Sequence, residues 1–478
     1  MFLFDFFRSF LPLHNPLGFG AADFVEFALT ALLLLAAVLG PRWMEPYGSR
    51  LARKTQWCML LLAGLPAGLR LALLAHHPVP VPEVYDEFGH LLVADTLRHL
   101  RLANPAHPLA QFFETQFVLQ QPTYSSIYPI GNGIALALGW VLFGLPWAGV
   151  LMAAAAFCAL CYWMLRAWTT PGWALLGGML AVLEFGPLSA WMNDYWGGAV
   201  AAVAGCLVFG ALPRILSRAR PRDAALLGAG LGLHLLTRPY ESIFLFLSVL
   251  LFFLPAVRKP GELRLLARLL PATLAVLLPA AGITLLHNKQ VTGSWTTLPY
   301  ALSQSQYGVP TSLTFQANPA PHRALNREQA LNYRMQTSFR PTGGETVKTF
   351  LQRLEYRVRY YRFFFLAPLY LAVPWFFQAL RQYRFLWVVL TVAVFVLGAN
   401  FYPFFEVHYI AAVTSLFVLA SVVGLEHLAR FSGGAARIIV FLCAAQFVFW
   451  YGMHAFEEFP AAAAMLRYET WNGIDHPD

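Results

Sequence analysis

The amino-acid sequence predicts an all-α polytopic membrane protein. Of its 478 residues, 58% are hydrophobic and only 12% are charged, whereas a soluble domain carries roughly a quarter charged residues. Apolar runs of about 20 residues, the length that spans a bilayer as a helix, recur along the chain. The basic residues gather in short loops between these runs, as the positive-inside rule describes for cytoplasmic loops. The net charge of +9 therefore gives no reason to expect a nucleic-acid partner.

The apolar runs predict about twelve transmembrane helices. They are expected near residues 22–40, 56–75, 147–166, 172–190, 197–212, 223–238, 240–257, 268–287, 362–380, 385–402, 409–425 and 437–455. The short loops with several basic residues fix the orientation: Arg42, Arg50, Arg53 and Lys54 in one, Arg214, Arg218, Arg220 and Arg222 in another, Arg258, Lys259, Arg264 and Arg268 in a third, and Arg381, Arg384, Arg430 and Arg437 further on. With these loops in the cytoplasm, both termini lie outside.

The segment 131–145 is apolar but too short for a comfortable crossing, and counting it as a span would reverse every later helix. We predict a helix there that enters the membrane from outside or packs against the bundle. The expected division is therefore an interfacial segment 1–21, two transmembrane helices in 22–75, a first outer loop 76–146, a central bundle 147–287, an outer cap 288–361, C-terminal helices in 362–456 and an outer tail 457–478. Within the first outer loop, 88–102 has the apolar spacing of an interfacial helix.

The strongest functional signal is the acidic stretch Tyr85-Asp86-Glu87, which follows the apolar run 57–75. Carboxylates at a membrane boundary are costly to desolvate, so they usually have a partner or a task. One interpretation is a hydrated pair just beyond a helix end. The other is a carboxylate whose burial raises its pKa, so that Asp86 takes a proton from an attacking group while Glu87 orients it. His90, one helical turn later, is expected either to contact this pair or to be an interface residue.

A second carboxylate, Asp194, lies in the motif Trp191-Met192-Asn193-Asp194-Tyr195-Trp196-Gly197-Gly198 at the same predicted face. It is either the N-cap of the next helix or a second site carboxylate. A divalent cation (Mg²⁺, Mn²⁺ or Zn²⁺) held by Asp86, Glu87 or Asp194 stands as the alternative to a metal-free site.

Cations are expected at the same outer face. Arg238, between two predicted helices in Thr-Arg-Pro-Tyr-Glu, suits bidentate capture of a phosphate, with pairing to Glu241 as the alternative. Lys289 follows the predicted helix 268–287, and His408 lies beside Glu406. The candidate substrate-binding residues are Tyr85, His90, Tyr128 and Tyr240. Tyr128 belongs to a Pro/Gly-rich polar segment, 120–133, that reads either as a binding loop or as a turn into the short helix.

Three ordered landmarks carry a resemblance to a known superfamily. They are Tyr85-Asp86-Glu87 in the first outer loop, the Tyr-Pro-x-Gly-x-Gly segment from Tyr128 to Gly133 ahead of a short apolar helix, and Asp194 after the next helical hairpin. In these features the chain resembles the GT-C membrane glycosyltransferases, in particular relatives of protein O-mannosyltransferase and lipid A aminoarabinose transferase. The match covers about the first 300 residues. The extra helix 22–40 and the lack of a large soluble C-terminal domain depart from the pattern.

The resemblance implies a GT-C type helical bundle and an enzyme that moves a sugar from a polyprenyl-phosphate-linked donor to an acceptor on the outer face of the membrane. By position, Asp86 matches the essential aspartate of the first loop. The implied acceptor is a glycan, a lipid or a protein, and the implied location is the bacterial inner membrane with the site on the periplasmic side. The alternatives are a lipid-linked oligosaccharide ligase or polymerase, a transporter or lipid flippase, and a non-catalytic partner in envelope assembly.

Overall fold

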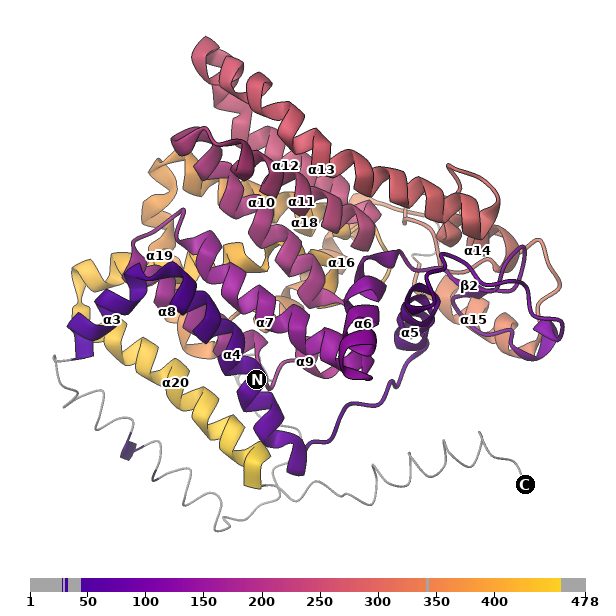
Figure 1. The fold of residues 1–478 in the computed structure, drawn as a ribbon, viewed down its shortest axis with the longest axis horizontal. Helices are drawn as coiled ribbons and strands as arrows, with labels where there is room; N and C mark the ends of the chain where they lie inside the picture. Colours follow the sequence, from indigo (N-terminus) through magenta and orange to yellow (C-terminus); the bar gives the residue numbers. More distant parts are fainter. Residues whose placement is uncertain (1–27, 29–30, 33–43, 341–343, 457–478) are drawn as a thin grey trace.

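The computed structural model describes residues 28, 31–32, 44–340 and 344–456, and this part of the chain is mainly helical (Figure 1). Seven of its helices are long and apolar enough to cross a membrane: Thr55–Ala75, Pro146–Leu165, Gly198–Arg218, Pro239–Arg258, Pro260–Thr292, Val407–Phe431 and Gly433–Gly452. The prediction of a helical membrane protein is thereby confirmed, whereas the number twelve stays a prediction. The predicted segments 1–21 and 457–478, and nearly all of helix 22–40, fall outside the described residues.

The helices in chain order include α3 (Met44–Arg53), α4 (Thr55–Ala72), α5 (Tyr85–Arg98), α6 (Ile130–Phe143), α7 (Pro146–Leu165), α8 (Pro171–Phe185), α9 (Ala190–Asn193), α10 (Gly198–Arg218), α11 (Pro221–Thr237), α12 (Pro239–Phe253), α13 (Pro260–Thr292), α18 (Tyr383–Ala399), the 3₁₀ helix η7 (Val407–Val413), α19 (Thr414–Phe431) and α20 (Gly433–Phe456). α10 is one of the two most enclosed of the seven long apolar helices, packed between α7, α11 and η7. Small residues allow this: Gly205 lies so close to η7 that a Cβ would come within 1.8 Å of the Ala412 carbonyl oxygen.

One predicted span is wrong as a continuous helix. The segment 362–380 is a series of short pieces: η4 (Arg359–Phe364), η5 (Ala367–Leu371), α17 (Val373–Phe376) and η6 (Phe377–Arg381). Pro368 and Pro374 explain the breaks, because proline has no N–H to donate and disfavours helical backbone in the residue before it. Hydrophobicity alone does not register these interruptions. In contrast, α13 is 33 residues long and extends beyond both ends of its predicted range.

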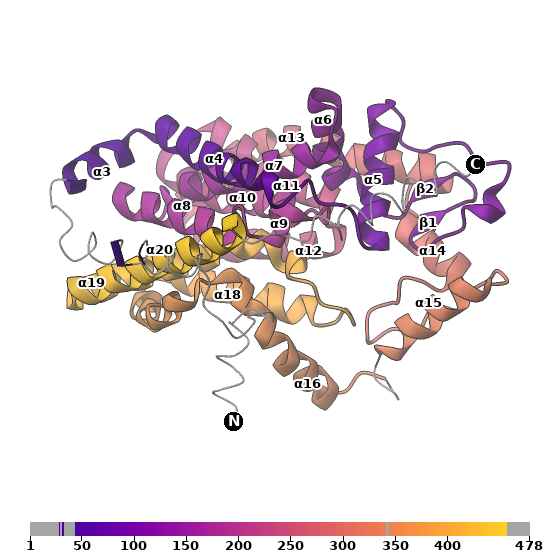
Figure 2. The same ribbon diagram turned by 90° about the horizontal axis from the view of Figure 1, so that it is seen from below.

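The outer segments gather at one end of the bundle. α5 and α6 stand there beside the two-stranded antiparallel hairpin β1 (Val118–Leu119) and β2 (Ser125–Ser126), in which Val118 pairs with Ser126. The predicted cap contains three helices: α14 (Pro299–Tyr307), α15 (Arg327–Ser338) and α16 (Val347–Val358). α5, α14, α15 and the hairpin lie together at this end in both views (Figures 1 and 2), while α15 and α16 project from one face (Figure 2). α5 begins three residues earlier than the predicted stretch 88–102, so Asp86 and Glu87 lie in its first turn.

The predicted short helix is present as α6. Its 14 residues give a length of about 21 Å at 1.5 Å per residue, less than the ~30 Å hydrocarbon core of a bilayer. α6 packs closely on α7, because Gly139 and Gly149 let the two backbones meet: a Cβ on Gly149 would lie 2.0 Å from the Ala135 carbonyl oxygen. This contact holds α6, and with it the loop that carries Tyr128.

Gly149→Ala is expected to destabilise the protein by about 1–3 kcal/mol, the usual cost of overpacking, because backbone has to move to admit the methyl group. The thermal unfolding midpoint of the detergent-purified protein checks this. Gly172→Ala, on α8, is the control, since nothing lies within 4 Å of an added Cβ there. Equal midpoints for the two variants would contradict the close α6–α7 contact.

Candidate functional site

A cavity of about 570 Å³ lies at the end of the bundle where the outer segments gather. Its walls come from α5, the loop before α6, the α11–α12 junction, the C-terminal part of α13, the cap helices α14 and α15, and the stretch from the end of α18 into η7. Trp196 also lines the cavity, so its walls come from five regions of the sequence: 84–130, 196, 235–241, 284–336 and 399–409. The charged side chains among the described lining residues are Asp86, Arg238, Glu241 and Glu406.

Asp86 and Tyr128 join the two motifs of the first outer loop. The Tyr128 hydroxyl donates a hydrogen bond to Asp86 Oδ1 at 2.5 Å, which leaves Oδ2 without a hydrogen bond from another side chain. Burial raises the pKa of the Asp86 carboxyl. The Tyr128 hydrogen bond, a hydrogen bond from the Asp86 backbone and the nearby Arg238 charge partly offset that rise. A carboxylate that is held on one oxygen and whose pKa is raised is suited to accept a proton on the other.

His90 packs on the same tyrosine. Its ring stacks on Tyr128 with 4.3 Å between centroids, and Gly89 leaves room for this, since a Cβ there would lie 2.8 Å from Tyr128 Cδ2. Burial, followed by the Arg238 charge, lowers the pKa of His90 to about 3, so the imidazole is neutral at pH 7. His90 lines the cavity, and its buried Nδ1 has no hydrogen-bond partner among the described residues.

Glu87 holds the start of α5 in place through hydrogen bonds to the backbone. Its side chain is 4% exposed, and Oε2 accepts hydrogen bonds from the backbone N–H of Glu83 at 2.7 Å and of Val84 at 3.3 Å. Oε1 accepts from the N–H of Tyr195 at 3.0 Å. As the third residue of α5, Glu87 reaches back to cap the helix start, as in a capping box. It also ties that start to the loop between α9 and α10.

Asp194 lies just behind the cavity wall rather than in its lining. Its Oδ1 accepts a hydrogen bond from the Trp196 N–H at 3.1 Å, while Gly197 occupies the N-cap position of α10 with a φ of 84°, so Asp194 is not the N-cap. Burial raises the pKa of Asp194 to about 7, and the charges of Glu87 and Glu406 add to the rise. Trp196, which Asp194 orients, does line the cavity.

Arg238 is the one arginine or lysine among the described lining residues. It lies at the junction where α11 ends and α12 begins, and its guanidinium is 5.2 Å from the ring centroid of Tyr409. In the described part of the chain it has no ion pair within 4.0 Å, so the alternative interpretation, a pairing with Glu241, is not present as a direct ion pair. Its charge nevertheless acts on Asp86 and on His90. An arginine that no carboxylate neutralises directly is free to bind an anion.

Of the ten predicted site residues, seven line the cavity: Tyr85, Asp86, His90, Tyr128, Arg238, Tyr240 and His408. Tyr85 also donates to Glu328 of α15 at 2.8 Å, and His408 packs edge-on against Trp196. Glu87 and Asp194 lie next to the cavity. Lys289 does not line it: its ammonium donates to the Gly293 carbonyl at 2.6 Å, at the C-terminus of its own helix, because α13 continues past it to Thr292.

Several lining residues were not predicted as site residues. The sequence marks Glu241 and Glu406 only as neighbours of Arg238 and His408. In the structure, both carboxylates line the cavity. Tyr300 of α14 and Tyr402 meet hydroxyl to hydroxyl at 2.6 Å, which joins the cap to the turn after α18. The sequence signal for the two glutamates was their place at predicted outer helix ends. No sequence signal marks Tyr300 and Tyr402, because tyrosine is common in the predicted outer segments.

The side chains as they lie provide no metal-binding set. Among the described residues, no group of three or more His, Cys, Asp and Glu side chains is arranged to hold a metal ion. Both oxygens of Glu87 accept backbone hydrogen bonds, and Asp194 lies outside the cavity lining. A divalent cation at Asp86, Glu87 or Asp194 stays a prediction, as does the alternative of a metal-free site.

Comparisons with protein-family models, with curated proteins and with solved structures found no match.

Glu87→Ala is expected to lower the thermal unfolding midpoint strongly, because it leaves three backbone N–H groups without their acceptor, each at a cost of about 1–3 kcal/mol. Differential scanning fluorimetry of the purified protein checks this. The control is Asp95→Asn on the same helix, which removes the charge that pairs with Arg98 and His99 at the surface and is expected to change the stability by less than about 1 kcal/mol. A Glu87→Ala protein as stable as the control would contradict the bracing role.

Proposed function

We propose that the protein is an integral membrane glycosyltransferase of GT-C type, which transfers a sugar from a polyprenyl-phosphate-linked donor to an acceptor on the outer face of the membrane. One observation carries the proposal: a half-buried carboxylate with a raised pKa, Asp86, shares a 570 Å³ cavity with Arg238, an arginine that forms no ion pair within 4.0 Å among the described residues. A base and an anion-binding group in one enclosed space are what the displacement of a phosphate from a sugar requires.

The proposed reaction is a single displacement at the anomeric carbon. The acceptor hydroxyl or amine attacks that carbon, its proton passes to Asp86 Oδ2, and the bond from the carbon to the phosphate oxygen breaks. The departing polyprenyl phosphate keeps the bonding electron pair, and Arg238 stabilises the negative charge that develops on it. Direct attack inverts the configuration at the sugar carbon. Tyr128 holds the other oxygen of Asp86 during the transfer.

The location of the cavity supports an outer-face enzyme. Arg238 stands at the end of α11 opposite to its basic start, where Arg220 and Arg222 lie. The same holds for α18, which begins near Arg381 and Arg384 and ends at the cavity wall with Ala399. By the positive-inside rule the basic ends are cytoplasmic, so the cavity opens on the outer side, which is the periplasmic side in a bacterial inner membrane.

The alternatives fit these features less well. A secondary transporter is expected to bind its substrate near mid-bilayer, often between two repeated halves, whereas Asp86 and Arg238 lie at helix ends. A lipid-linked oligosaccharide ligase or polymerase uses the same chemistry with a larger donor. The acceptor, whether glycan, lipid or protein, distinguishes these enzymes.

The direct test measures release of polyprenyl phosphate from a panel of polyprenyl-phosphate sugars by purified wild type, Asp86→Asn and Arg238→Gln. We expect Asp86→Asn to lose at least about 100-fold in kcat, the usual contribution of a general base, and Arg238→Gln to lose a comparable factor with a raised donor KM. Asp95→Asn is the matched control. Mass spectrometry of co-purified lipid identifies the donor. Full turnover in Asp86→Asn would exclude Asp86 as the base.

Tyr128→Phe is expected to shift the acid limb of the pH–rate profile to higher pH. The Tyr128 hydrogen bond stabilises the ionised Asp86 and so lowers its pKa; without it the pKa rises, and the base is protonated at a higher pH. Activity should therefore fall most below neutral pH and recover at alkaline pH. An acid limb at the wild-type position would show that Tyr128 does not act on the base.

A further inference from the structure

A buried arginine of the cap helix α16 holds one wall of the cavity. Arg357 is 2% exposed, and its guanidinium donates to four backbone carbonyls: Ala399 at 3.0 Å, Tyr402 at 2.5 Å, Pro403 at 2.9 Å and Phe404 at 3.0 Å. In the described part of the chain it has no carboxylate partner within 4.0 Å. Its charge is therefore balanced by the carbonyl dipoles of this one stretch.

Those carbonyls belong to the C-terminal end of α18 and the turn that follows it. The last carbonyls of a helix have no partner within the helix, and a cation placed there also interacts favourably with the helix dipole. The turn supplies cavity residues throughout: Ala399, Tyr402 and Phe404 line the cavity, and the chain continues directly into Glu406 and His408.

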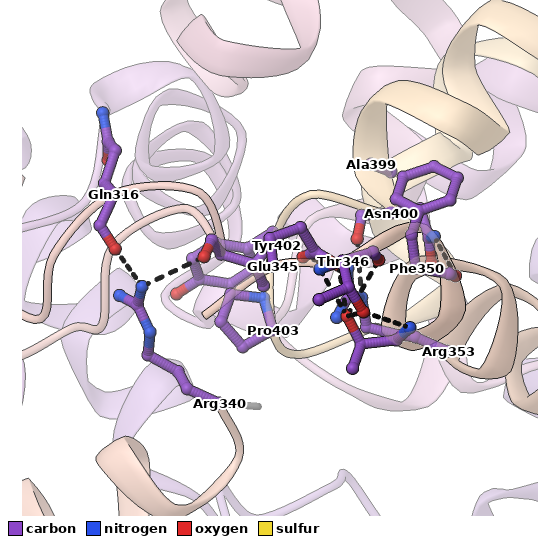
Figure 3. Close-up of polar contacts among 12 residues, drawn as sticks. Gln316, Arg340, Glu345, Thr346, Phe350, Arg353, Ala399, Asn400, Tyr402 and Pro403 are labelled. Atoms are coloured by element: carbon purple, nitrogen blue, oxygen red, sulfur yellow. Dashed lines mark hydrogen bonds and ion pairs between the residues drawn. The ribbon is translucent and has the colours of Figure 1, made fainter. Parts of the chain in front are cut away.

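A second arginine one helical turn earlier extends the same contact. Arg353 donates to the Asn400 carbonyl at 2.7 Å and to the Glu345 carboxylate at 2.6 Å, and Asn400 Nδ2 returns a hydrogen bond to the Phe350 carbonyl at 2.9 Å (Figure 3). Arg353 also reaches the Thr314 hydroxyl at 3.4 Å. The N–H of Thr314 in turn donates to the Phe401 carbonyl at 2.8 Å, so the loop before α15 is tied to the same turn.

Much of the remaining surface of α16 is exposed. Val347, Leu351 and Val358 are each more than half exposed, and Arg357 is the one fully buried residue of the helix. The helix is attached to the turn after α18 through its two arginines, through the hydrogen bond from Asn400 to the Phe350 carbonyl, and through the Phe350 ring, which packs on Phe401 at 5.0 Å between centroids. It lies where it can hold the turn after α18 but contributes no side chain to the cavity lining itself.

We propose that Arg357 is a positioning residue, which holds the backbone of 399–404 so that Tyr402 and Glu406 keep their places in the wall of the cavity that they share with Asp86. The inference rests on the proposed function for its effect on turnover, but its effect on the turn is independent of any reaction. Lysine at this position keeps the charge and reaches only some of the carbonyls, because it lacks the planar fork of five donors.

The test compares Arg357→Gln and Arg357→Lys with wild type. Hydrogen–deuterium exchange without substrate is expected to be at least about tenfold faster for amides of 399–409 in Arg357→Gln and intermediate in Arg357→Lys. Turnover is expected to fall at least tenfold in kcat in Arg357→Gln and to be partly restored in Arg357→Lys. The donor KM is expected to change less than kcat, because the backbone of Arg238 belongs to the α11–α12 junction, although its guanidinium packs on Tyr409 at the end of the affected stretch. Rates are compared on samples that elute as a single species with a wild-type unfolding midpoint. If Arg357→Gln does not fold, Arg357→Lys alone carries the comparison.

The control is Arg359→Gln, which removes an exposed arginine of the same segment that packs on Tyr356 and is expected to leave exchange and kcat unchanged. The proposal is overturned if the amides of 399–409 exchange in Arg357→Gln at the same rate as in the wild type, whatever the turnover. It is also overturned if these amides exchange faster but kcat equals that of the wild type. Absence of turnover in the wild type with every donor contradicts the proposed function instead, and the exchange rates then still decide whether Arg357 holds the turn.

Discussion

The site depends on one buried carboxylate that itself takes no part in the proposed reaction. Glu87 accepts three backbone hydrogen bonds, two from the entry to α5 and one from Tyr195. The carbonyl of the same Tyr195 accepts from Asn132 of α6 at 2.8 Å. One peptide segment between α9 and α10 therefore fastens both helices of the first outer loop. Because Glu87 fixes the first turn of α5, it also fixes the direction in which its neighbour Asp86 projects.

Two adjacent carboxylates thus acquire different properties from their surroundings. Glu87 is buried but surrounded by N–H donors, which replace its lost hydration. Asp86 is half-buried, Tyr128 is the one side chain that donates a hydrogen bond to it in the described part of the chain, and its pKa is raised. The difference arises from their positions around the helix axis, since successive residues are about 100° apart. The Glu87 side chain therefore points into the protein, whereas that of Asp86 points toward the cavity.

The sequence predicts the parts of this site that local signals mark. Asp86 was recognisable as an acidic residue at a membrane boundary, and Tyr128 from its place in a Pro/Gly-rich loop ahead of a short helix. The hydrogen bond between Asp86 and Tyr128 could not be predicted from the sequence, because it joins residues 42 positions apart and depends on how α6 packs. Lys289 was assigned to the site because hydrophobicity placed the helix end too early. Arg357 was missed for a related reason: an arginine in a polar cap segment looks exposed until the backbone carbonyls that surround it are known.

The electrostatics of the cavity couple donor binding to the base in the proposed reaction. Arg238 lowers the pKa of Asp86, although burial outweighs this effect. A donor phosphate bound to Arg238 neutralises the same charge, and its own negative charge lies close to the carboxylate. Both changes destabilise the ionised form of Asp86 and raise its pKa further. Asp86 is then a stronger proton acceptor when the donor is in place than when the cavity is empty. With Arg238 as the single arginine or lysine among the described lining residues, no second guanidinium or ammonium group in that lining would weaken this coupling.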